Sequence, residues 1–222
     1  GIAGAAWGTA IASAVQALVL LGWMLRPKLN ALYHSRATWR FSGKRVGRIL
    51  VTGLPAGAQF SLEIGAFAIF TIVLVGRFGT VQLAAHNLTF KLLEVAFMPA
   101  VGLGTAVIAA VGKAIGEGDK PLARRIVRWA TAFNMGYMGL VAVGYVTLRQ
   151  ELVGLLTDDA QVAAWATKLL LLCAVFQLFD AMGITHSHAL RGAGDVRWPS
   201  LATIVLVFTV LVGGGFAMAE LR

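Results

Sequence analysis

The sequence predicts an all-α, polytopic helical membrane protein with six transmembrane helices. Of its 222 residues, 58% are hydrophobic and only 13% are charged, whereas a soluble globular domain has about 25% charged residues. The mean hydropathy is +0.78. The apolar residues also gather in six runs, each long enough to supply the roughly 20 residues that an α-helix needs to cross a bilayer. We therefore expect lipid, rather than water, to cover most of the surface.

The six apolar runs are predicted to be helices rather than β-strands. In chain order they are Ile2–Leu25, Ile49–Gly76, Leu83–Val111, Trp129–Leu148, Val162–Leu190 and Pro199–Ala219. None of them alternates polar and apolar residues with period two, as the strands of a membrane β-barrel do. Three runs contain no charged side chain, and the others hold Glu63, the pair Lys91 and Glu94, and the pair Lys168 and Asp180.

Basic residues indicate which side of the membrane is cytoplasmic. Seven, five and two of the 19 Lys and Arg residues lie in segments 26–48, 112–128 and 191–198. Six spans would put these three segments on one side, and the positive-inside rule makes that side the cytoplasm. The predicted location is the cell (inner or plasma) membrane. The net charge of +9 then reflects topology and anionic lipid headgroups, so no nucleic-acid partner is expected.

The sequence lacks the motifs of common enzyme sites. His186 and His188 are two residues apart, so on a helix they point about 200° apart and cannot share a metal ion. The turn Gly116-Glu-Gly-Asp119 has no Gly-Lys-Ser or Gly-Lys-Thr after it, so it is no phosphate loop. We therefore expect neither enzymatic activity nor an organic cofactor.

Two carboxylates inside the predicted spans are the leading candidates for function. An ionisable residue at the bilayer centre costs about 3 kcal/mol or more, so it usually faces a cavity or a partner. Glu63 lies 15 residues after Arg48, which is roughly 22 Å along a helix. Asp180 lies 11 residues before Arg191, roughly 16 Å from the same side. Acidic groups at comparable depth on two helices suit reversible binding of a cation or proton.

Polar neighbours extend this candidate site. Gln59 precedes Glu63 by four residues and Gln177 precedes Asp180 by three, so each carboxylate shares a helical face with an amide. The third run carries a polar stripe of Asn87, Lys91 and Glu94. Together these residues predict a polar cavity lined by several helices. A purely structural interpretation stays open, with Lys91 and Glu94 as an ion pair and the two carboxylates hydrogen-bonded between helices.

Several sequence blocks resemble the multidrug and toxic compound extrusion (MATE) transporters over essentially the whole chain. Gly53-Leu-Pro-Ala-Gly57 with Glu63 is similar to their seventh helix. Four blocks are similar to their eighth helix and the loop after it: Leu83-Ala-Ala-His-Asn87, Phe97-Met-Pro99, Gly102-Leu-Gly104 and Gly116-Glu-Gly-Asp119. Three further elements are similar to their tenth helix and the cytoplasmic segment after it: Gln177-Leu-Phe-Asp180, Ala189-Leu-Arg-Gly-Ala-Gly-Asp195 and Pro199.

The resemblance implies a division of the chain. Members of the family have twelve helices in two six-helix lobes. On that map, residues 1–25 are the last helix of the N-terminal lobe and residues 26–48 are the basic cytoplasmic linker between lobes. Residues 49–222 are then the C-terminal lobe without its final helix. The rest of the N-terminal lobe would be a partner supplied by the same parent chain.

The resemblance also implies secondary active export of cationic or amphipathic small organic compounds in exchange for Na⁺ or H⁺. In many members, carboxylates of the seventh and tenth helices bind the coupling ion. The matching positions here are Glu63 and Asp180, where a Na⁺ would be the only metal ion expected. Two alternatives are a flippase for lipid-linked oligosaccharides from the same superfamily and an inactive membrane scaffold fragment. The flippase ranks lower because Lys91 is the only cation in the middle of a span.

Overall fold

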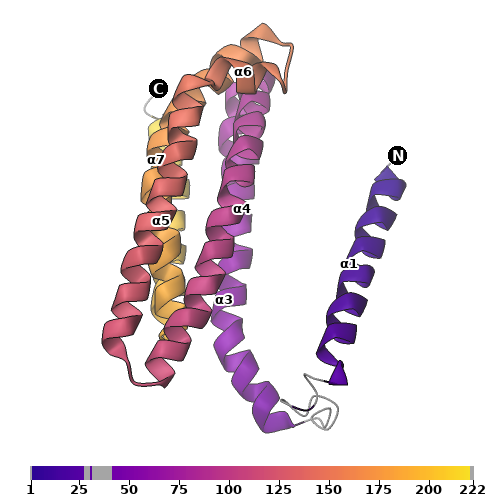
Figure 1. Ribbon diagram of the computed structural model, residues 1–222. Coiled ribbons are helices and arrows are strands. Elements are labelled where there is room, and N and C mark those ends of the chain that lie inside the picture. The colour runs from indigo at the N-terminus through magenta and orange to yellow at the C-terminus, as the bar shows by residue number, and fades with distance from the viewer. Residues whose placement is uncertain (1, 28–30, 32–41, 221–222) are drawn as a thin grey trace. The chain divides into compact units, whose positions relative to one another are not determined.

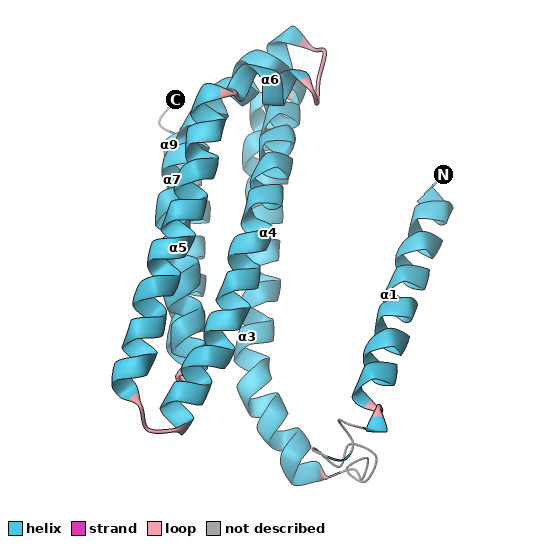
Figure 2. Ribbon diagram, viewed as in Figure 1, coloured by secondary structure: helices cyan, strands magenta, loops and turns pink. Residues whose placement is uncertain are grey.

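The described part of the chain is helical. The computed structural model describes residues 2–27, 31 and 42–220, and over these residues it contains helices and turns without a strand (Figure 2). Most of the predicted linker 26–48, namely residues 28–30 and 32–41, lies outside the described residues. The chain divides into two compact units, Gly1–Leu50 and Val51–Arg222. The all-α prediction is confirmed.

The helices follow the predicted runs closely. The first unit contains α1, Ile2–Met24, and the helix α3, Gly43–Ile69, continues from it into the second unit. The remaining elements are η1 (Phe70–Leu74), η2 (Val75–Phe78), α4 (Thr80–Gly116), α5 (Lys120–Thr147), α6 (Arg149–Gly154), α7 (Ala160–Gly192), α8 (Arg197–Leu206), η3 (Val207–Gly214) and α9 (Gly215–Glu220).

Five stretches of helix are long and apolar enough to cross a membrane. They are Ala6–Met24, Gly53–Phe78, Thr80–Gly116, Ala160–Gly192 and Arg197–Glu220. The sixth predicted span, Trp129–Leu148, coincides with most of α5, which is not among these five. Asn134, Tyr137 and Tyr145 lower its hydropathy, so the crossing of α5 stays a prediction.

The core of the second unit is a bundle of α4, α5 and α7, which lie side by side in Figure 1. Small side chains fill its interior, among them Ala85, Ala96, Ala142, Ala166 and Ala174. Helices in lipid gain little from burying apolar surface, so close approach through small residues and hydrogen bonds between helices hold such bundles together. The bundle is therefore built as a membrane-embedded core would be.

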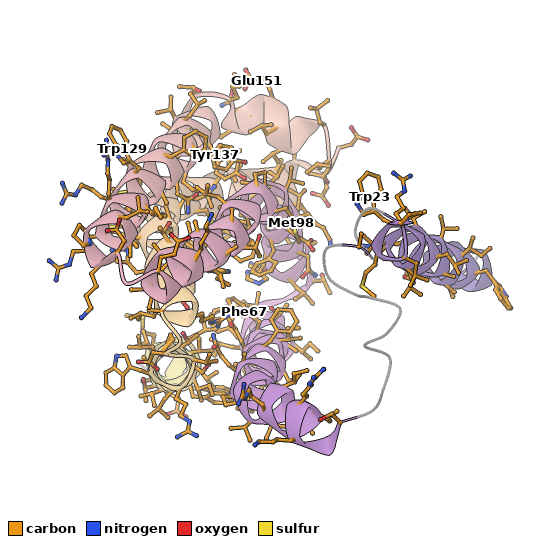
Figure 3. The ribbon with its side chains drawn as sticks, turned by 60° about the horizontal axis from the view of Figure 1, so that its bottom comes forward. Trp23, Phe67, Met98, Trp129, Tyr137 and Glu151 are labelled. Atoms are coloured by element: carbon orange, nitrogen blue, oxygen red, sulfur yellow. The ribbon has the colours of Figure 1, made fainter. Side chains whose placement is uncertain are left out.

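Polar side chains of α5 form hydrogen bonds inside this bundle. The Tyr145 hydroxyl donates to the Leu92 carbonyl at 2.6 Å, and the Tyr137 hydroxyl donates to the Ala96 carbonyl at 3.1 Å. The Asn134 amide donates to the Thr185 hydroxyl at 3.0 Å. These groups therefore face α4 and α7, while Trp129 lies on the outer side of α5 (Figure 3).

Acidic caps begin α5 and α7. The Asp119 carboxylate accepts a hydrogen bond from the Leu122 amide at 2.8 Å, and the Asp159 carboxylate accepts one from the Gln161 amide at 2.8 Å. A carboxylate here satisfies backbone N–H groups that have no partner within the helix. The chain turns into α5 through Gly118, whose φ of 79° suits glycine.

Candidate functional site

The two predicted carboxylates lie on α3 and α7, within electrostatic range of each other. Glu63 lies on α3 and Asp180 on α7, and both side chains are half-buried. Glu63 is close enough to act electrostatically on Asp180. Two like charges in a medium of low dielectric repel each other strongly. A cation or proton that bound between them would relieve this repulsion.

Gln59 has a partner that the sequence analysis did not foresee. Its carboxamide oxygen accepts a hydrogen bond of 2.7 Å from an Arg191 guanidinium nitrogen. Gln59 is 5% exposed, and the Nε atom of Arg191 is buried without a hydrogen-bond partner among the described residues. A guanidinium is therefore held one helical turn along α3 from Glu63.

From the sequence, Arg191 is predicted only as a marker of the cytoplasmic end of α7. The sequence indication of a further role for Arg191 is its place in the block Ala189-Leu-Arg-Gly-Ala-Gly-Asp195, which resembles the MATE family. A basic residue at a helix end is also expected to interact with the last carbonyls or with water. Nothing in the sequence indicates that its side chain reaches a buried amide on α3. The positive charge is nevertheless part of the environment of the candidate site.

Gln177 is buried in the core of the α4, α5 and α7 bundle, although the sequence predicts that it lies beside Asp180. It is 2% exposed and occupies the same helical stripe as Ala174 and Ala181, which face the α4, α5 and α7 bundle. Tyr145 of α5 is a polar neighbour. Gln177 is thus near the site along α7, but its amide belongs to the polar contacts between α5 and α7.

The predicted polar stripe on α4 is exposed in the described structure. Asn87, Lys91 and Glu94 all lie at its surface. The Lys91 ammonium and the Glu94 carboxylate are 2.8 Å apart, and their side chains are 77% and 46% exposed. The structure therefore contains the predicted ion pair, and the stripe has no covering neighbour among the residues described. Its role in lining a cavity stays a prediction.

An aromatic cluster lies beside η1 and α4. The His86 ring is centred 6.0 Å from Phe70 and 5.8 Å from Phe90, and Phe90 is 5.4 Å from Phe67. Figure 3 labels Phe67 on α3. His86 Nε2 also lies 3.2 Å from the Thr71 hydroxyl, so this polar side chain is accommodated by a neighbouring helix.

No cluster of three His, Cys, Asp or Glu side chains suited to a metal ion occurs in the part of the chain that the structure describes. The Glu63 and Asp180 pair offers carboxylate oxygens only. Oxygen ligands suit hard cations rather than transition metals. The arrangement is therefore chemically suited to an alkali cation or a proton.

Comparison with known proteins gives a consistent result. The family model described as MatE matches residues 55–214. The chain is 36% identical over 203 residues to the probable multidrug resistance protein NorM of Xanthomonas axonopodis pv. citri, covering 90% of this chain and 43% of that protein. It is 32% identical to the NorM of Pseudomonas putida over 86% of this chain and 41% of that protein.

A differently named relative points the same way. The multidrug resistance protein MdtK of Edwardsiella ictaluri is 30% identical over 172 residues, covering 78% of this chain and 37% of that protein. The chain thus spans less than half the length of these curated relatives. The matched segment includes both Glu63 and Asp180.

Proposed function

Because the chain belongs to the MatE family, we propose that it forms part of an antiporter that exports cationic or amphipathic small organic compounds in exchange for Na⁺ or H⁺. Names of relatives that refer to multidrug resistance support the export of drugs. The location that we propose is the plasma membrane, with segments 26–48, 112–128 and 191–198 in the cytoplasm.

The observation that carries the proposal is that Glu63 on α3 lies within electrostatic range of Asp180 on α7. Their mutual repulsion favours capture of one positive charge, whether a proton, a Na⁺ ion or a cationic substrate. If these ligands compete for the same pair, entry of the ion displaces the substrate. Exchange then follows without a covalent step, which agrees with a transporter rather than an enzyme.

Gln59 and Arg191 have a supporting role in this scheme. The 2.7 Å hydrogen bond to Gln59 engages the guanidinium of Arg191. That engagement limits its approach to Glu63, one turn further along α3. The carboxylates can then bind a mobile cation, because they do not form an ion pair with the Arg191 guanidinium.

The alternative of a lipid-linked oligosaccharide flippase gains no specific support. Such a substrate carries a pyrophosphate and needs free cations in the cavity. The ammonium of Lys91 is already 2.8 Å from Glu94, and the guanidinium of Arg191 is hydrogen-bonded to Gln59. The exporter is therefore the function that this arrangement supports best.

The proposal is tested by neutralising each carboxylate without changing its size. In the protein with any sequence that its gene encodes on either side, Glu63→Gln and Asp180→Asn should each abolish drug efflux that depends on Na⁺ or pH. Both variants should still reach the membrane in near-normal amounts. Drug accumulation inside everted vesicles, whose cytoplasmic face is outward, is the readout, measured across a range of Na⁺ concentrations and pH values.

The double variant Lys91→Gln with Glu94→Gln is the matched control. It removes both partners of the ion pair, so no orphan charge is left in the membrane, and efflux should be affected less. If both single carboxylate variants retain efflux with unchanged dependence on Na⁺ and pH, the coupling assignment is wrong.

A further inference from the structure

A groove between α4 and α5 is not explained by the transport site. Its volume is about 580 Å³. Almost all of the lining is apolar, and among the residues that the structure describes only Arg125 contributes a charged side chain to it. Residues that define its shape are Leu103, Ala106 and Ala110 of α4, and Leu122, Trp129 and Phe133 of α5.

Differences in side-chain size create the groove. On α4, the short side chains of Ala106 and Ala110 form the floor of the groove. On α5, the larger rings of Trp129 and Phe133 form its wall. These two rings are 67% and 69% exposed, and Figure 3 shows Trp129 on the outer side of α5. In a membrane, such an outward-facing apolar groove is open to lipid chains.

The end of the groove at Arg125 carries positive charge that nearby acids do not neutralise. Arg125 forms no ion pair within the described residues, and Lys120, Arg124 and Arg128 lie within one and a half turns of it. Two acidic residues are close in sequence, but both are engaged. The Asp119 carboxylate caps α5, and the Glu117 carboxylate lies 3.9 Å from the Lys113 ammonium.

The dimensions fit one leaflet of a bilayer. Arg125 and Phe133 are eight residues apart on α5, which is about 12 Å along the helix axis. One leaflet contributes roughly 15 Å of the hydrocarbon core. A headgroup at Arg125 would therefore let an acyl chain run along the groove past Trp129 to Phe133. Trp129 is then near the headgroup region, where tryptophan is enriched in membrane proteins.

We propose that this groove binds an anionic phospholipid, with the phosphate against Arg125 and an acyl chain between α4 and α5. The ligand comes from the leaflet that contains Arg125. The lipid would be held at a defined place, because its phosphate would bind Arg125, which has no acidic partner among the described residues. Its acyl chain would then lie along apolar walls about as long as one leaflet is thick. It does not depend on the ion-coupling role of Glu63 and Asp180.

Native mass spectrometry in detergent, with phosphatidylglycerol and phosphatidylcholine added at equal concentration, tests the proposal. The protein is expressed with any sequence that its gene encodes on either side, and retained lipids are counted. We expect phosphatidylglycerol to be retained preferentially. Arg125→Gln should reduce its retention about fivefold, because one Lys or Arg contributes about that factor in binding to anionic lipid.

Two pairs of variants separate the groove from general surface charge. Arg124→Gln removes a neighbouring exposed cation that does not line the groove, and it should leave retention unchanged. Ala106→Leu fills the groove from an exposed position, and it should reduce retention. Ala109→Leu adds the same bulk at an exposed α4 position outside the groove, and it should have no effect.

Three results would overturn the proposal. The first is equal loss in Arg125→Gln and Arg124→Gln, which would indicate attraction by the basic surface as a whole. The second is equal retention of the two phospholipids by the unmodified protein. The third is no retained lipid at all, which would mean that another part of the protein covers the groove.

Discussion

Glycines at the crossing of α4 and α7 determine how closely these two helices approach. A Cβ atom on Gly192 would lie 2.7 Å from the carbonyl oxygen of Ile108 and 3.0 Å from its Cα. Both are backbone atoms, so the clash cannot be relieved by turning a side chain. Near the same crossing, a Cβ on Gly104 would lie 2.8 Å from the ring of His188. The absence of side chains at these positions is therefore a packing requirement.

Gly192→Ala should consequently destabilise the protein by about 1–3 kcal/mol, the usual cost of overpacking. The measurement is unfolding from mixed micelles by a denaturing detergent. Gly183→Ala in the same helix is the control, because a Cβ there meets nothing within 4 Å. That variant should be neutral or stabilising, since alanine favours a helix over glycine by about 1 kcal/mol. Equal effects of both variants would contradict the packing argument.

The candidate site shows how far single residues could be predicted from the sequence. Counting residues from the basic helix ends predicts Glu63 and Asp180 at comparable depth, and in the structure Glu63 lies within electrostatic range of Asp180. Their role in ion coupling stays a prediction. The partner of Gln59 could not be predicted in this way. It depends on the tilt and register of α3 against α7 and on the reach of the Arg191 side chain. Residue spacing within one helix gives no information about this packing between helices.

At the scale of whole elements, hydropathy predicted the helices well but not their internal geometry. Five of the six runs are long and apolar enough to span a membrane. Within two spans, however, the helix widens to a π-helix at η1 and η3. A Cβ on Gly215, just after η3, would lie 2.7 Å from Leu74 in η1. This close contact depends on tertiary packing, so the widened turns could not be derived from apolar periodicity.

The status of α5 provides a prediction at this scale. It has 28 residues, about 42 Å of helix, and its polar groups at Asn134, Tyr137 and Tyr145 are hydrogen-bonded inside the bundle. Such a helix can cross a bilayer despite lower hydropathy, because its polar groups do not meet lipid. We therefore expect its two ends to lie on opposite sides of the membrane.

Single cysteines test this expectation in a Cys173→Ala background with an impermeant maleimide. Lys120→Cys, at the basic start of α5, should be labelled only after cells are permeabilised. Asp158→Cys, in the connection between α6 and α7, should be labelled in intact cells. Both positions are exposed, so accessibility is decided by sidedness. Labelling of both from the same side would show that α5 does not cross.

At the scale of the whole molecule, the polar stripe of α4 indicates that the described residues do not complete the functional unit. The Lys91 and Glu94 side chains are 77% and 46% exposed, in the interior of a helix long and apolar enough to span the membrane. Each charge at the bilayer centre would cost about 3 kcal/mol if lipid covered it. A second protein surface or a water-filled cavity is the expected neighbour.

The length of the relatives agrees with this argument, since the chain spans 43% of the NorM protein of Xanthomonas axonopodis pv. citri. Transporters that alternate access generally move one bundle against another around a central site. We therefore expect the 222-residue chain alone to insert into liposomes but to catalyse no exchange of drug for Na⁺ or H⁺. The protein expressed with any flanking sequence that its gene encodes, reconstituted in the same liposomes, should show exchange. Flux from the 222 residues alone, abolished by Asp180→Asn, would contradict this expectation, because it would mean that exchange needs no other part of the parent protein.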